Sequence, residues 1–212
     1  IFKTISLDVE QREALNQMFM EKFGVGEDMI TSETISSTIS SEMKSDTIIA
    51  VAVAIVCMLI YIRIRFSDIR FGISSVVALL HDVLIVLAFY AVARVSISNT
   101  FIACMLTIVG YSINATIVIF DRVRENMNTM TKKDTLKDVV NKSITQTLSR
   151  SIFTSLTTFI MVAALYILGV TSIRDFALPL MVGIVAGAYS SVCLTGAVWY
   201  LLRTKFPPKA SN

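Results

Sequence analysis

Long runs without a charged side chain constrain this chain more than any other feature of its sequence. Residues 95–120, 151–173 and 176–202 contain no charged residue, and each run is longer than the roughly 18 residues that indicate a membrane-spanning helix. Charged residues make up only 17% of the 212 residues, too few to cover the surface of a water-soluble domain of this size. The sequence therefore predicts an integral membrane protein.

Two further apolar runs complete the predicted membrane region. Residues 71–93 are interrupted only by His81 and Asp82, and residues 47–62 form a shorter run that Tyr61 can help to anchor at the lipid headgroups. We therefore expect an all-α membrane bundle at residues 46–206, followed by a cytoplasmic tail at residues 207–212. The five expected spans are residues 46–64, 70–93, 96–120, 145–170 and 175–202.

Basic residues are unevenly distributed among the segments that join these spans. Residues 63–70, 121–143 and 203–212 hold most of the arginines and lysines, whereas the other two connecting loops hold one each, Arg94 and Arg174. This alternation is the positive-inside pattern. It predicts a cytoplasmic C-terminus and an extracytoplasmic N-terminal segment. The basic residues on the cytoplasmic side also explain the net charge of +3, so we do not expect nucleic acid as a partner.

Residues 1–45 form the sizeable polar segment of the chain. Residues 2–6 and 28–37 are typical of strands, and residues 8–24 are typical of an amphipathic helix that begins at Asp8 and stops at Gly24. A piece of this size is too small to bury a core alone. We expect it to be the C-terminal part of an extracytoplasmic α+β domain whose start precedes residue 1, since the chain opens without Met and without a signal peptide.

Two smaller features bear on the class of protein. Residues 121–143 mix charged and apolar side chains, and we expect a short helix on the membrane surface there. Cys57, Cys104 and Cys193 lie in different apolar runs without metal-ligand spacing, so we interpret them as packing residues. Because the HExxH, P-loop and GxSxG motifs are missing, we expect no cofactor, no metal and no enzymatic activity.

Asp82 is the most informative residue for function. It lies about 18 Å along the helix from Arg70, near the middle of the second span. A charged group at that depth costs at least about 2.5–3.5 kcal/mol unless it is protonated, paired or hydrated. Such a residue is by default a proton or ion site, and the alternative is a structural hydrogen-bond anchor between helices. His81, about 100° round the helix, either tunes this site or packs against a neighbouring helix.

Arg150 and Asn114 lie closer to the cytoplasmic side. If the fourth helix begins near Ile144, both lie roughly 9–10 Å inside their spans and can meet between neighbouring helices. Arg150 either lowers the pKa of a nearby carboxyl as a fixed charge or extends to the headgroups. Asn114 is either a transport ligand or a hydrogen-bonding contact between helices. Polar groups at two depths favour ion-coupled transport over an enzyme.

Gly183 and Gly187 are four residues apart in the last span and therefore share one face of the helix. Small residues at this spacing let another helix approach closely. We interpret both as helix-packing residues.

Four motifs in this order resemble the SecF family of protein-export membrane subunits, which belongs to the resistance-nodulation-division (RND) superfamily. They are YIRIRFSDIRFGISSVVALLHD, GYSINATIVIFDRVREN, TLSRSIFTSLTTFIMVAALYILG and IRDFALPLMVGIVAGAYSSV. The resemblance covers about residues 45–203. It implies an RND/SecF-type bundle in the bacterial cytoplasmic membrane that acts with SecD, the SecYEG channel and a translocating unfolded polypeptide. It fits either a separate SecF subunit or the SecF half of a SecD–SecF fusion.

The resemblance also implies that the proton gradient helps to pull polypeptides across the membrane, with Asp82 and Arg150 in the proton path. The family has an aspartate at the position of Ala115, and alanine neither titrates nor balances Arg150. Either Asp82 suffices, or the SecD half supplies a carboxyl, or coupling is weakened or absent. A non-conducting scaffold subunit is therefore a competing interpretation. An RND-type small-molecule exporter is another, and the order of the motifs argues against it.

Overall fold

A computed structural model describes residues 7–24, 26, 37–66, 68–95, 97, 99–131 and 134–207. The chain divides into two compact units, residues 1–45 and residues 46–212. The described part of both units is helical and contains no strand.

In the N-terminal unit, helix α1 spans Val9–Phe23. The Val9 backbone N–H donates a hydrogen bond to the Asp8 side chain at 2.8 Å, and Gln11 completes a capping box. Gly24 ends the helix in the left-handed conformation, with a φ of 62°. These caps confirm the helix expected from the sequence and both of its ends. The two expected strands lie almost entirely outside the described residues.

Among the described residues, five helical segments are long and apolar enough to cross a membrane. The first four are α2 (Ser37–Arg65, apolar from residue 45), α3 (Ile69–Ala93), α4 (Asn99–Asn128) and α5 (Leu136–Leu168). The fifth consists of three helices in direct succession, namely α6 (Thr171–Tyr189), the π-helical η2 (Ser190–Thr195) and α7 (Gly196–Lys205). The all-α bundle of five spans expected from the sequence is confirmed.

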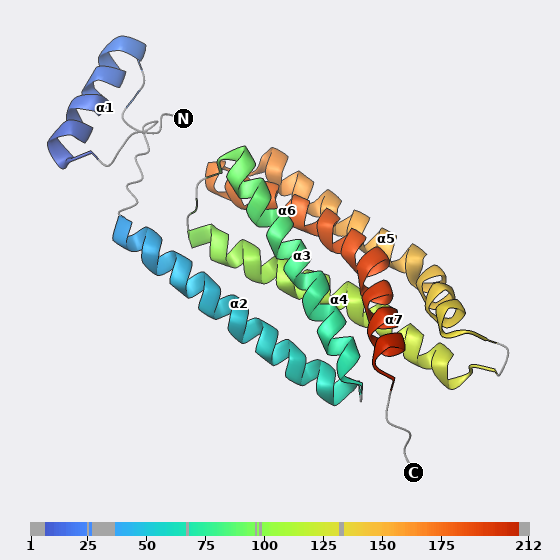
Figure 1. The fold of residues 1–212 in the computed structure, drawn as a ribbon. Coiled ribbons are helices and arrows are strands. Elements are labelled where there is room, and N and C mark those ends of the chain that lie inside the picture. The colour runs from blue at the N-terminus through green and yellow to red at the C-terminus, as the bar shows by residue number, and fades with distance from the viewer. Residues whose placement is uncertain are drawn as a thin grey trace. The chain divides into compact units, whose positions relative to one another are not determined.

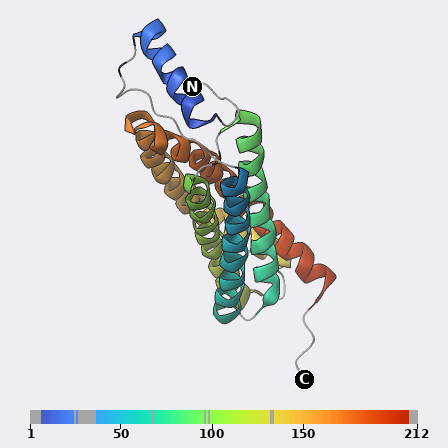
Figure 2. The same cartoon turned by 90° about the vertical axis from the view of Figure 1, so that its left-hand side faces the viewer.

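The fifth segment is the most buried of the five, and its helix α6 contacts α3, α4 and α5. Helices α2 and α5 are the least buried and lie on opposite flanks of the bundle in Figure 1. Figure 1 and Figure 2 show the α2–α3 turn, the α4–α5 connection and the end of α7 together at one end of the bundle. Two ion pairs join these segments there, Arg65 Nη2 with Asp121 Oδ1 at 2.7 Å and Arg203 Nη1 with Asp68 Oδ2 at 2.9 Å.

Aromatic side chains fill the core near this end. The rings of Phe71 and Trp199 stack with centroids 4.9 Å apart, and Phe71 meets Phe120 edge to face at 4.6 Å. Phe66 packs on Phe71 at 5.1 Å. Because these rings come from α3, α4, α7 and the end of α2, they fix the relative positions of those helices.

The segment between the third and fourth spans differs from the expectation. The expectation of a separate surface helix within residues 121–143 was wrong, because α4 continues to Asn128 and α5 already begins at Leu136. Val140 is buried and lies against Gly196 of α7, where an added Cβ would be 3.1 Å from its Cγ1. Since its apolar side packs on other helices, this segment extends the spanning helices instead of lying on lipid.

Candidate functional site

Asp82 on α3 has no exposed surface and is surrounded by polar side chains. Ser112 Oγ of α4 donates a hydrogen bond to Asp82 Oδ2 at 2.5 Å, and Ser190 Oγ of η2 donates to the same oxygen at 2.8 Å. His81 Nδ1 lies 3.0 Å from the other oxygen, Oδ1. The carboxyl group therefore joins three helical segments, and both of its oxygens have a polar partner.

Two backbone features let these segments approach one another. A Cβ added to Gly187 would lie 3.6 Å from Asp82 Oδ2 and 3.5 Å from Ser112 Cβ, so a small residue leaves room for α3 and α4. The last span changes to π-helical geometry at Ser190, and π turns often occur at functional sites. The Ser190 hydroxyl also lies 3.3 Å from the Gly187 carbonyl oxygen, which gives it a second acceptor beside Asp82.

His81 connects Asp82 with the outside of the bundle. Its side chain is 31% exposed, whereas that of Asp82 is fully enclosed. It borders a shallow apolar groove on the outer face of α3 together with Leu84 and Ile85, and its ring centroid lies 6.0 Å from that of Tyr189. Adjacent helix positions differ by about 100°, yet the imidazole reaches back to the carboxyl group.

A second polar group lines a cavity of about 60 Å³ between α4 and α5. Its lining residues are Tyr111, Asn114, Ala115 and Val118 of α4 and Arg150, Ser151, Thr154 and Ser155 of α5. Asn114 and Arg150 thus border one cavity, with Ala115 in the same lining. Within the described part of the chain, the Arg150 side chain forms no ion pair.

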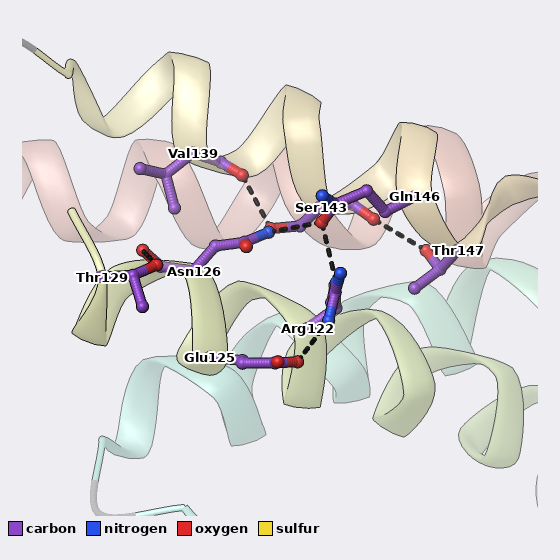
Figure 3. A network of polar contacts seen from close by, with 8 residues as sticks. All are labelled: Arg122, Glu125, Asn126, Thr129, Val139, Ser143, Gln146 and Thr147. Atoms are coloured by element: carbon purple, nitrogen blue, oxygen red, sulfur yellow. Dashed lines mark hydrogen bonds and ion pairs between the residues drawn. The ribbon is translucent and has the colours of Figure 1, made fainter.

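A polar network joins α4 to α5 near the connection between them (Figure 3). Asn126 Nδ2 donates to Ser143 Oγ at 2.8 Å and to Gln146 Oε1 at 2.9 Å. Arg122 Nε also donates to Gln146 Oε1, at 2.7 Å, and its Nη1 pairs with Glu125. In the sequence, both charged residues belong to the mixed segment 121–143. In the structure this network sets the spacing of the two helices that form the cavity.

Sequence reasoning missed the two hydroxyl groups that donate hydrogen bonds to Asp82. Ser112 lies inside GYSIN and Ser190 inside GAYSS, so both were within the quoted motifs. Small hydroxyl residues are common in membrane helices because they also hydrogen-bond to their own backbone. Only the packing of α3 against α4 and η2 decides that these two serines face Asp82.

Comparisons with known proteins agree on one family. Residues 16–205 match the family described as Protein export membrane protein SecD/SecF, C-terminal. Protein translocase subunit SecF from Alicyclobacillus acidocaldarius is 44% identical over 181 residues, which are 84% of this chain and 58% of that protein. The SecF subunit from Sebaldella termitidis is 40% identical over 210 residues, 99% of this chain and 68% of that protein.

One solved structure with a similar fold is the crystal structure of SecDF, a translocon-associated membrane protein from Thermus thermophilus. It superposes on 93% of this chain with a TM-score of 0.79 and 37% sequence identity, and the match covers 27% of the SecDF chain. This chain therefore spans about a quarter of SecDF and only part of each SecF relative.

Proposed function

This chain belongs to the SecD/SecF C-terminal family of protein-export membrane proteins, and we propose from this that it serves in an accessory subunit of the Sec protein translocase. In this proposal it acts with a SecD-type half beside the SecYEG channel and uses the proton gradient to promote movement of unfolded polypeptide across the bacterial cytoplasmic membrane. A relative in which both halves form one SecDF chain supports the SecD partnership. The distribution of basic residues supports a cytoplasmic C-terminus and an extracytoplasmic N-terminal unit.

The enclosed Asp82 carboxyl is the observation that carries proton coupling. A deprotonated carboxylate accepts hydrogen bonds from both Ser112 and Ser190. If the proton is on Oδ2, that oxygen can no longer accept from both serines and one of the two hydroxyl groups loses its acceptor, whereas a proton on Oδ1 is donated to His81 Nδ1 and leaves both serine contacts in place. Ser190 has the Gly187 carbonyl oxygen within reach. A proton that reaches Oδ2 would therefore release Ser190 from α3 and loosen the contact between α3 and the π turn.

His81 and Arg150 have different parts in this proposal. His81 lies between the Asp82 carboxyl and the outer face of α3, and an imidazole can both accept and release a proton. It is therefore the proposed relay to Asp82. Arg150 keeps its proton, so with Asn114 it forms a fixed electrostatic element of the path instead of a carrier.

The test uses the full-length protein that contains this chain, reconstituted with its SecD partner and the channel. Asp82→Asn preserves the size of the side chain but removes its titration. We expect this variant to copurify with the complex and to lose the part of polypeptide export that depends on an imposed proton gradient. Asp175→Asn removes an exposed carboxylate elsewhere in the bundle and is the matched control, with unchanged export.

Ala115 favours a second candidate function, a scaffold subunit that conducts no protons. The cavity that Arg150 borders has no carboxylate among its described lining residues, so these residues do not supply the electrostatic partner expected at residue 115. A scaffold tolerates Asp82→Asn, so full gradient-dependent export by that variant would favour the scaffold and contradict proton coupling through Asp82.

A further inference from the structure

The last span holds one residue more than an uninterrupted α-helix could place between its two contacts with α3. Ser190 of η2 reaches Asp82, and Trp199 of α7 stacks on Phe71. Asp82 and Phe71 point only about 20° apart on α3, so they lie on one face. Ser190 and Trp199 would point about 180° apart in an α-helix, but only about 80° apart once a π turn absorbs one extra residue. The π turn therefore lets both side chains reach α3.

Tight packing on both sides of the π turn keeps this extra residue inside the span. On the α6 side, a Cβ added to Gly183 would lie 2.5 Å from Ile108 Cγ1 of α4. On the α7 side, a Cβ added to Gly196 would lie 2.9 Å from Ile144 Cδ1, and Trp199 has no exposed surface. Neither side can rotate without a clash. The extra residue must therefore form a π turn somewhere between Gly183 and Gly196.

Two hydrogen bonds of Ser190 hold the π turn at its observed place. Thr195 Oγ1 donates to the Ser190 carbonyl oxygen at 3.1 Å, five residues back along the chain, whereas a threonine in an α-helix reaches three or four residues back. The Ser190 hydroxyl donates to Asp82 Oδ2 at 2.8 Å, and the Gly187 carbonyl oxygen is a second acceptor at 3.3 Å. Only the bond to Asp82 depends on the protonation of another helix.

We propose that the π turn is a movable element, which shifts toward α6 when a proton on Asp82 Oδ2 releases Ser190. This proposal rests on the proposed function, because protonation of Asp82 is its trigger. Each residue that the π turn passes rotates by about 100°, so Ser190 turns away from α3 while both ends of the span stay in place. The close packing of Gly196 prevents movement toward α7, whereas residues 186–188 are only alanine and glycine.

The groups packed around Asp82 determine what else can respond to acid. His81 of α3 contacts its Oδ1, and Tyr189 of α6 lies beside His81 with the ring centroids 6.0 Å apart. Helices α4 and η2 present the hydroxyl groups of Ser112 and Ser190. Because an imidazole also takes up protons, any response to acid has to be tested for its dependence on Asp82 itself.

Deletion of Cys193, an exposed residue inside the π turn, tests the movement by removing the extra residue. The shortened span forms a continuous α-helix with both ends in register, so it has no π turn to shift. In the full-length protein with its SecD partner and the channel, we expect this variant to copurify. Its export with an imposed proton gradient should fall to the level measured without one. Cys193→Ala keeps the number of residues and is the matched control, with unchanged export.

Solid-state NMR of the unaltered full-length protein in lipid bilayers follows the movement without a deletion. Carbonyl-labelled glycine and nitrogen-labelled alanine report the two Gly–Ala pairs of this chain, Gly187–Ala188 in α6 and Gly196–Ala197 in α7. Each signal is assigned by its loss in Ala188→Ser or Ala197→Ser. On acidification we expect the first pair to change its chemical shift and the second to keep it. In the Asp82→Asn protein the first pair should not respond to acid.

The outcomes separate this movement from the proposed function. Full gradient-dependent export after deletion of Cys193, together with loss of export in Asp82→Asn, overturns the movable π turn and leaves proton coupling in place. Full export by Asp82→Asn contradicts the proposed function and the trigger of the movement with it. If the deletion variant does not assemble, the NMR measurement decides. A Gly187–Ala188 signal that ignores acid, or that responds equally in Asp82→Asn, overturns the proposal.

Discussion

Gly183→Ala is expected to destabilise the bundle, because the α6 backbone lies directly against α4 at this position. A Cβ on residue 183 would lie 2.5 Å from Cγ1 and 2.6 Å from Cδ1 of Ile108. The Ile108 side chain is 1% exposed, so it has no solvent to turn into. Since carbon atoms in contact prefer about 3.5–4.0 Å, the two helices or the isoleucine must move. Overpacking of this kind costs about 1–3 kcal/mol.

Gly187→Ala is the matched control one turn further along the same helix. A Cβ there would meet Ser112 Cβ at 3.5 Å and Asp82 Oδ2 at 3.6 Å, which are ordinary contact distances. Alanine favours a helix over glycine by up to about 1 kcal/mol, so we expect this variant to be neutral or slightly more stable. Both variants gain the same helix propensity, so this gain cancels when their free energies of unfolding are compared. Their free energies of unfolding should therefore differ by roughly 1–3 kcal/mol.

Denaturant-induced unfolding of the full-length protein in detergent measures both free energies. Ile108→Ala provides a second check, because it removes the atoms that an added Cβ would meet. Gly183→Ala should consequently cost less in the Ile108→Ala background than on its own. Equal stability of the two glycine variants, or strictly additive effects in the double variant, would refute the proposed contact between α4 and α6.

Asn126→Ala removes two hydrogen bonds between α4 and α5 and is expected to destabilise the protein by about 1–3 kcal/mol, with the exposed Asn128→Ala as control in the same unfolding assay. Ala115→Asp is expected to leave the complex assembled and to raise proton-dependent export, measured over a series of imposed gradients. Thr131→Val removes the hydroxyl group whose hydrogen bond holds the pKa of Asp134 below its usual range, so an NMR titration should show this pKa rising.

Each of these expectations has a result that contradicts it. A similar stability loss from both asparagine variants would mean that the network does not hold α4 to α5. Export that stays the same across all gradients would contradict the role assigned to residue 115. The hydrogen bond from Thr131 stabilises the charged form of Asp134 in the folded protein and so lowers its pKa. The stability that this hydrogen bond contributes is present above the usual aspartate pKa and is lost as the pH falls through the lowered pKa. An Asp134 pKa that does not change in the Thr131→Val protein would contradict the hydrogen bond.

Much of the bundle follows from the order of residues along the chain. A backbone in hydrocarbon must satisfy its own hydrogen bonds, so an apolar run of sufficient length has to be helical. Because the helix rise per residue is constant, the depth of Asp82 and the similar depths of Asn114 and Arg150 could be calculated. The cap residues Asp8 and Gly24 likewise act on their own helix end, and the ends of α1 were correctly expected.

The sequence could not determine which residues from different helices meet, because this depends on the rotation and spacing of whole helices. Both Ser112 and Ser190 lie far from Asp82 along the chain, and their hydroxyl groups reach its carboxyl only through helix packing and the π turn at Ser190. The surface helix expected between the third and fourth spans was wrong for the same reason, since its apolar side packs on α7. The order of residues thus determined the five helices and the depth of their polar groups. Tertiary packing alone decided that two hydroxyl groups bind the enclosed Asp82 carboxyl and that Arg150 borders a cavity whose described lining contains no carboxylate.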